Sequence, residues 1–158
     1  MERRLTILVG TMTGTAQLVA EEVADALKAE GVSAEVRPMD GLDAGVFAGG
    51  GAFLVCTSTY GQGDVPDNAQ KLFAELEQKK PDLGGIVYGV IALGDRTYAQ
   101  TFCFGGKRFD ALLQSLGAKR VGDIMLHDAS AGTIPEEEAV AWIGSWLDRF
   151  RAALDEAA

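Results

Sequence analysis

Short apolar runs alternate with helical patterns along the whole chain, and this alternation limits the fold more than any other feature. Leu5–Val9, Ala52–Cys56 and Ile86–Leu93 are nearly continuous in apolar residues, as in strands that are buried on both faces. Such strands need a parallel sheet with helices on each side, which the intervening segments can supply. The other expected elements are a helix at Thr15–Glu30, a strand at Ser33–Arg37, helices at Ala69–Lys79 and Lys107–Leu116, a strand at Arg120–Leu126 and a helix at Glu136–Leu154.

The alternation predicts an α/β fold: a doubly wound, five-stranded parallel sheet in the order 2-1-3-4-5, with right-handed crossovers. A length of 158 residues fits one domain spanning residues 1–158. In such a sheet, ligands bind beyond the carboxyl ends of the strands, where the strand order switches between the first and third strands. We therefore expect the functional residues to follow Val9, Cys56 and Leu93.

The chain is acidic, with 14 basic and 23 acidic residues and a net charge of −9. This balance argues against nucleic-acid binding, which requires phosphate neutralisation. It suits a monomer steered toward a basic-faced partner protein, and from charge alone it suits simple solubility equally well. No apolar run reaches the roughly 18–20 residues of a membrane helix, and the first residues lack the features of a secretory signal. Cys56 and Cys103 occur without a CxxC or Cys/His pattern, so we expect no metal site. Two free thiols would fit a cytoplasmic location, which we expect, while a disulfide between them stays open from the sequence.

The first loop, Gly10–Ala16, joins a strand directly to a helix and has the composition of a phosphate site. Backbone N–H groups at a helix start attract anions, and Thr11, Thr13 and Thr15 add hydroxyl donors. Gly14 permits close approach of the backbone. The lysine of a GxxxxGK[ST] loop is missing. A simple threonine N-cap would account for one hydroxyl and not for three, so we favour a monophosphate site.

The second and third loops each carry a tyrosine at the same expected edge of the sheet. Tyr60 lies within Thr57–Asn68, a segment longer than most connections of this kind, and Tyr98 follows the fourth expected strand. Two such tyrosines can sandwich a planar heterocycle, although Tyr60 could instead pack on the surface of its own loop. Asp67 and Asn68 are expected to cap the next helix rather than to contact a ligand.

Three further residues lie in or after these loops, and each has its own expectation. Phe102 is expected to anchor its loop in the core. For Cys103, core packing and lining of the site both stay open, because a thiol behaves as a small apolar group. The single histidine, His127, is expected at the surface or at a helix cap.

Together, the motifs GTMTGTA, TSTYGQGDVPDN and LGDRTYAQTFC resemble those of the flavodoxin-like FMN-binding family, and the resemblance covers nearly the whole chain. The fifth expected strand leads to the last helix without the additional loop of long-chain flavodoxins, so the chain resembles the short-chain type. Gly117–Lys119, Ile134–Glu136 and Trp142–Trp146 resemble MioC-type flavodoxins. The second loop and Gly106–Lys107 resemble the FMN domains of diflavin reductases.

The resemblance implies FMN as the cofactor, with its phosphate in the first loop and its ring flanked by Tyr60 and Tyr98. It also implies that backbone groups of the second and third loops meet the edge of the flavin. The cofactor-binding residues implied in this way are Thr11, Met12, Thr13, Gly14, Thr15, Ala16, Ser58, Thr59, Tyr60, Gly61, Gln62, Gly63, Leu93, Gly94, Asp95, Tyr98, Phe102, Cys103 and Asp128.

Two functions stay open for such a protein. The first is an electron carrier that shuttles between a reductase and an acceptor enzyme, and the alternative is an FMN-dependent NAD(P)H:quinone reductase. The sequence has no general acid–base constellation, so no catalytic residue is assigned, and tyrosines on both ring faces would obstruct a nicotinamide. Both points favour the carrier. A phosphoacceptor receiver is excluded because Gly10, Thr11 and Cys56 stand where its acidic residues would be needed.

Overall fold

The computed structural model describes residues 4–11, 14–40, 42–47, 51–59, 66–94, 103–128 and 133–157. Its strands are β1 (Arg4–Gly10), β2 (Ser33–Pro38), β3 (Gly51–Thr57), β4 (Ile86–Gly94), β5 (Lys119–Arg120) and β6 (Met125–Asp128). Its helices are α1 (Thr15–Ala29), α2 (Asp67–Lys79), α3 (Phe104–Ser115) and α4 (Pro135–Ala157), with a short 3₁₀ helix η1 (Ala44–Phe47) that the sequence did not lead us to expect.

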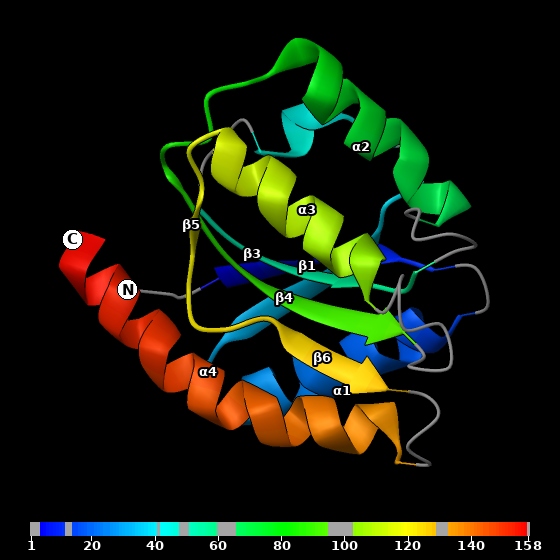
Figure 1. Ribbon diagram of the computed structural model, residues 1–158. Helices are drawn as coiled ribbons and strands as arrows, with labels where there is room; N and C mark the ends of the chain where they lie inside the picture. Colours follow the sequence, from blue (N-terminus) through cyan, green and yellow to red (C-terminus); the bar gives the residue numbers. More distant parts are fainter. Residues whose placement is uncertain are drawn as a thin grey trace.

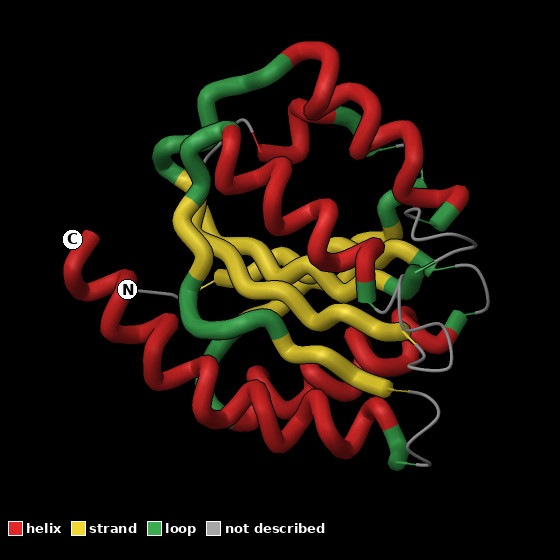
Figure 2. Tube along the Cα trace, viewed as in Figure 1, coloured by secondary structure: helices red, strands yellow, loops and turns green. Residues whose placement is uncertain are grey.

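The strands form a parallel sheet in the order β2-β1-β3-β4-β5, with β6 pairing further along β4. The predicted fold class and strand order are thus confirmed. Helices α1 and α4 cover one face of the sheet, and α2, α3 and η1 cover the other (Figure 1). Figure 2 shows the resulting three layers, with the strands between two sets of helices.

Each face of the sheet carries its own hydrophobic cluster because neighbouring strand residues point to opposite sides. In β1, Ile7 packs with α1 and α4, whereas Leu8 packs with α2, α3 and η1. Both side chains are fully buried. The apolar runs of the sequence therefore have the cause that we inferred, namely burial on two faces rather than one.

The strand expected at Arg120–Leu126 is divided, and the prediction of one continuous strand was wrong. β5 ends at Arg120, and Gly122 then adopts the left-handed conformation at φ +70°. The indole of Trp146 donates to the carbonyl of Val121 at 2.8 Å. The chain leaves the ladder here and rejoins β4 at Met125. Apolar patterning alone cannot show a left-handed glycine that turns a strand aside.

Several element ends also differ from those expected. α3 begins at Phe104 rather than Lys107, since the glycines of its first turn allow the helix to lie close on the sheet: a Cβ on Gly106 would collide with Ala92 of β4. β2 ends at Pro38, one residue beyond the expected end of this strand at Arg37. Proline is tolerated there because β2 is an edge strand.

Gly89 in β4 should be essential for the packing of α4 on the sheet. A Cβ at this position would lie 2.5 Å from Nε1 of Trp146, whose side chain is buried. Gly89→Ala should therefore lower the free energy of unfolding by about 1–3 kcal/mol through overpacking. Gly144→Ala, in the same helix as Trp146 but facing open space among the described residues, should raise it by up to ~1 kcal/mol through helix propensity. Urea unfolding measures both, and a Gly89→Ala protein as stable as wild type would contradict this packing.

Candidate functional site

The ends of β1, β3 and β4 lie side by side at one edge of the sheet. Gly10 is in register with Thr57, and Thr57 with Ala92. The segments that follow these strands are therefore brought together, as the sequence predicted. Among the implied cofactor residues, the structure describes Thr11, Gly14, Thr15, Ala16, Ser58, Thr59, Leu93, Gly94, Cys103 and Asp128; Met12, Thr13, Tyr60, Gly61, Gln62, Gly63, Asp95, Tyr98 and Phe102 lie outside the described residues.

The start of α1 has the properties of an anion site. Gly14 precedes the helix with φ +92°, and its N–H donates to Oγ1 of Thr11 at 2.9 Å. A Cβ built on Gly14 would meet no described atom within 4 Å, and the first turn of α1 carries no acidic residue. The first backbone N–H groups of a helix lack partners within the helix and carry its positive dipole end. These features fit a phosphate held by neutral donors.

Ala16 ties this helix start to the sheet. It is fully buried, and its carbonyl accepts from the thiol of Cys56 at 3.4 Å. Burial raises the pKa of the Cys56 thiol to about 12. Cys56 is therefore a neutral packing residue beneath the loop and not a nucleophile.

Asn68 connects the first loop to α2 and does not cap that helix, so the capping prediction was wrong for this residue. The N-cap residue of α2 is Pro66, without a side-chain cap bond. Oδ1 of Asn68 instead accepts from the N–H of Thr11 at 2.8 Å. The side chain of Asn68 therefore acts on another segment of the chain.

Ser58 and Thr59 continue the framework at the end of β3. The N–H of Ser58 donates to the carbonyl of Gly10 at 3.0 Å. Oγ1 of Thr59 donates to the carbonyl of Leu93 at 3.1 Å and accepts from the N–H of Gly105 at 3.0 Å. The hydroxyl of Thr59 thereby joins the second loop, the end of β4 and the start of α3.

Cys103 lies at the foot of the third loop in the left-handed conformation, with φ 57°. Its side chain is fully buried, and its thiol donates to the carbonyls of Ala92 at 3.3 Å and His127 at 3.6 Å. Gly94 allows the chain to return this closely, because a Cβ there would lie 2.5 Å from the backbone nitrogen of Cys103. In this structure Cys103 belongs to the core cluster on the α2–α3 side of the sheet.

His127 is buried, not at the surface as one of our expectations held. It lies in β6 opposite Leu93, and only 3% of its surface is exposed. Nδ1 lies 2.8 Å from Oε2 of Glu138 in the first helical turns of α4. Two hydrogen bonds hold the pKa of the Glu138 carboxyl below its usual range. The bond with His127 has the larger effect, and the bond with Thr133 has the smaller one. Asp128 follows His127 and lies in register with Gly94, at the edge of the site.

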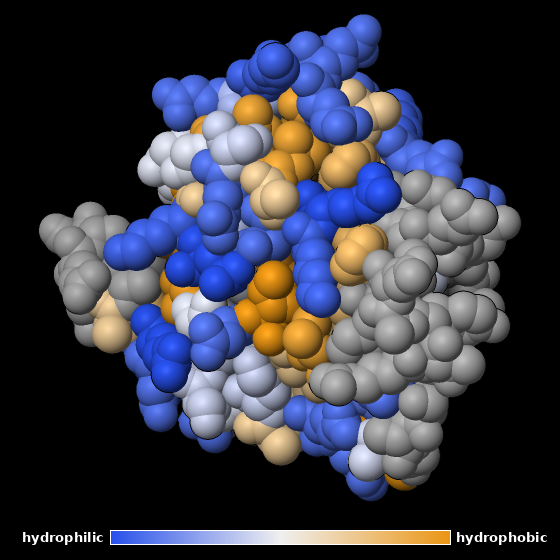
Figure 3. All heavy atoms as spheres, viewed as in Figure 1, coloured by the Kyte–Doolittle hydropathy of each residue, from blue (hydrophilic) through white to orange (hydrophobic). Residues whose placement is uncertain are grey.

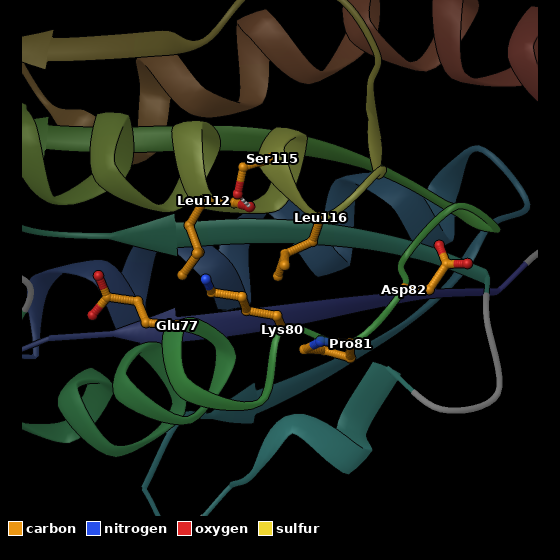
Figure 4. Close-up of a pocket in the computed structure, with 7 residues that line it drawn as sticks. All are labelled: Glu77, Lys80, Pro81, Asp82, Leu112, Ser115 and Leu116. Atoms are coloured by element: carbon orange, nitrogen blue, oxygen red, sulfur yellow. Dashed lines mark hydrogen bonds between the residues drawn. The ribbon is translucent and has the colours of Figure 1, made fainter.

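A pocket of about 500 Å³ is lined by residues near the carboxyl ends of α2 and α3, at the opposite ends of these helices from the candidate site (Figure 4). Its charged residues, Glu77, Lys80 and Asp82, are of mixed sign, and the hydroxyl of Ser115 donates to its own helix at 2.6 Å. We assign no ligand to it.

Among the residues that the structure describes, no group of three or more His, Cys, Asp or Glu side chains could hold a metal ion. No helix in the described part of the chain is long and apolar enough to cross a membrane.

Comparison with known proteins gives consistent matches over nearly the whole chain. The sequence model of the family described as flavodoxin matches residues 7–142. Flavodoxin YqcA of Escherichia coli (strain K12) is 45% identical over 140 residues, which cover 89% of this chain and 93% of that protein. Protein MioC of the same strain is 35% identical over 147 residues, covering 93% and 98%. A flavodoxin from Pseudomonas aeruginosa with a cysteine-to-alanine substitution superposes with a TM-score of 0.84 and 36% identity, covering 94% of this chain and 99% of that one.

The two hydrogen bonds of the Thr59 hydroxyl should contribute measurably to stability. Thr59→Val keeps the side-chain shape but leaves the Leu93 carbonyl and the Gly105 N–H without this partner, at a cost of about 1–3 kcal/mol. Thr59→Ser keeps the hydroxyl and should lose less. The free energies of unfolding in urea distinguish the two, and equal values for the Val and Ser variants would show that the hydroxyl bonds do not matter.

Proposed function

This chain belongs to the flavodoxin family, and on that premise we propose that it shuttles electrons between a reductase and an acceptor enzyme. Flavodoxins bind FMN and act as electron carriers, so this chain is an FMN-containing electron carrier. Its partners, the residues that hold FMN and the face on which partners dock are proposed below. FMN supplies the redox chemistry when it is bound.

The phosphate of FMN is proposed to lie at the start of α1. The observation that supports this placement is the open, acid-free helix start at Gly14, with Oγ1 of Thr11 and the exposed Thr15 beside it. Thr11 accepts from Gly14 through its oxygen, so its hydroxyl hydrogen can still be donated to an anion. The chain thus offers hydrogen bonds to the phosphate without a neutralising lysine or arginine in Gly10–Ala16.

The flavin ring is proposed to lie across the ends of β3 and β4. The side chain of Thr59 is engaged with Leu93 and Gly105, so it serves to hold the framework. From the sequence resemblance, backbone groups of the two loops are proposed to meet the edge of the ring. Tyr60 and Tyr98, from the sequence resemblance, are proposed to cover the two ring faces and to exclude water. The residues of the chain would bind, orient and shield the cofactor; none would take part as an acid or base.

The charge distribution supports a basic-faced partner. In this topology every helix that follows a strand begins at the edge where the site lies. The first turns of α2 and α4 at this edge contain Asp67 and Glu136–Glu138, whereas Lys28 and Lys79 lie in the last turns of α1 and α2, at the opposite edge. Lys107 and Arg108 in α3 reduce this asymmetry without cancelling a net charge of −9. A positively charged partner would be steered toward the flavin edge.

We also propose that the chain acts as a monomer in the cytoplasm. Two buried thiols, Cys56 and Cys103, suit a reducing compartment, and the net charge of −9 opposes self-association.

Electron transfer should respond to ionic strength with a sign that depends on the acceptor. The reduced protein should pass electrons to cytochrome c, a basic one-electron acceptor, about tenfold more slowly at high than at low ionic strength, because salt screens the attraction. With ferricyanide, a small anion, the rate should instead rise with salt. Stopped-flow absorbance measures both rates.

Two results would contradict this proposal. Rates that do not change with salt for either acceptor would exclude an acidic docking face. Sustained NADPH oxidation by the chain alone in the presence of a quinone would identify a reductase instead of a carrier.

A further inference from the structure

The side chain of Asn68 joins three segments that lie far apart in the sequence. Its Oδ1 accepts from the N–H of Thr11 at 2.8 Å. Its Nδ2 donates to the carbonyl of Val9 at 3.2 Å and to Oδ1 of Asp40 at 2.9 Å. One amide from α2 therefore holds the end of β1, the first residue of the phosphate loop and the segment that follows β2.

The chemistry of its neighbours fixes the orientation of this amide. The oxygen faces an N–H donor, and the NH₂ group faces a carbonyl and a carboxylate, which only accept. A flipped amide would oppose donor to donor and acceptor to acceptor. Few other side chains have one acceptor and two donors in such an arrangement, so position 68 calls for asparagine on chemical grounds.

A chain of hydrogen bonds leads from this amide to the start of α1. The backbone N–H of Thr11 is held by its hydrogen bond to Oδ1 of Asn68, and Oγ1 of Thr11 accepts from the N–H of Gly14 at 2.9 Å. Gly14 is the N-cap residue of α1. The position of Asn68 is thus transmitted through two bonds to the backbone that would face the phosphate.

We propose that Asn68 is a positioning residue that sets the phosphate-binding conformation of the first loop through Thr11, with Asp40 orienting its amide. This inference rests on the proposed function, since it assumes FMN at the α1 start. Helix capping does not explain the residue, because α2 begins after Pro66 without a side-chain cap bond. Core packing does not explain it either: Asn68 is half-buried and Asp40 is exposed.

The test compares FMN with riboflavin, which has the same ring but no phosphate. The full chain is titrated with each flavin, and flavin fluorescence reports the bound fraction. Asn68→Ala should weaken FMN binding about tenfold, as expected when roughly one hydrogen bond to the charged phosphate is lost. Riboflavin affinity should change by less than about twofold. A residue that merely stabilised the fold would change both affinities in proportion.

The control is Gln70→Ala, which truncates another side-chain amide on the same helix. Gln70 is exposed, and its Nε2 contacts Asp67 of its own helix at 3.4 Å. This variant should leave both affinities unchanged. Urea unfolding of each variant measures stability separately from binding.

A second pair of variants carries the test if Asn68→Ala does not fold. Asn68→Asp conserves size but removes both donated bonds and sets a second carboxylate against Asp40, so FMN affinity should fall by at least as much as for alanine. The double variant Asp40→Asn with Asn68→Asp places the amide at position 40 and the carboxylate at position 68. The amide at position 40 can then donate a hydrogen bond to the carboxylate at position 68. The double variant should recover part of the FMN affinity lost in Asn68→Asp.

Equal losses of FMN and riboflavin affinity in the Asn68 variants, or no loss of either, would overturn the positioning role while leaving the carrier function intact. A wild-type chain that binds neither flavin would overturn both. If the double variant bound FMN no more tightly than Asn68→Asp alone, Asp40 would have no role in orienting the side chain at position 68.

Discussion

A parallel sheet that is buried on both faces has to satisfy the carbonyl groups near the ends of its strands, and here side chains from other segments supply donors. A buried carbonyl that is left without a donor costs about 1–3 kcal/mol. The carbonyls of Val9, Leu93 and Ala92 accept from Asn68, Thr59 and Cys103, respectively. The bonds that satisfy the sheet also connect the loops to one another, so the framework of the site is a direct consequence of building the sheet.

Close approach of backbones is the second condition, and a few glycines provide it. A Cβ on Gly105 would collide with the carbonyl of Ser58, so the start of α3 can lie against the second loop only with glycine there. A Cβ on Gly10 would lie 2.6 Å from Oγ1 of Thr57, where β1 and β3 end together. Apolar side chains also reach the surface: Figure 3 shows them between hydrophilic residues, and Leu126 of β6 is 41% exposed. At Gly10 and Gly105, glycine thus permits close approach at the edge that carries the candidate site.

The sequence was sufficient for the strand order and for the meeting of the ends of β1, β3 and β4 at one edge of the sheet, because burial on two faces and β–α alternation follow directly from patterning. It was insufficient where one residue acts on a distant segment. Asn68 carries the local signature of a cap, and only the fold brings Thr11 to it. His127 likewise looked like a surface residue until β6 placed it beneath α4, beside Glu138. The strand turns aside at Gly122, and the carbonyl of the preceding Val121 accepts from the indole of Trp146, which lies 24 residues after Gly122. Contacts of this kind are set by topology and leave no mark in the local pattern.

We propose that this framework holds FMN for one-electron transfer between proteins, in which bound FMN supplies the redox chemistry. The most direct test is the absorbance spectrum of the FMN-loaded protein during stepwise anaerobic reduction. We predict a long-wavelength band that grows to half reduction and then disappears. A direct change from the oxidised to the fully reduced spectrum, with no band at half reduction, would contradict a one-electron carrier.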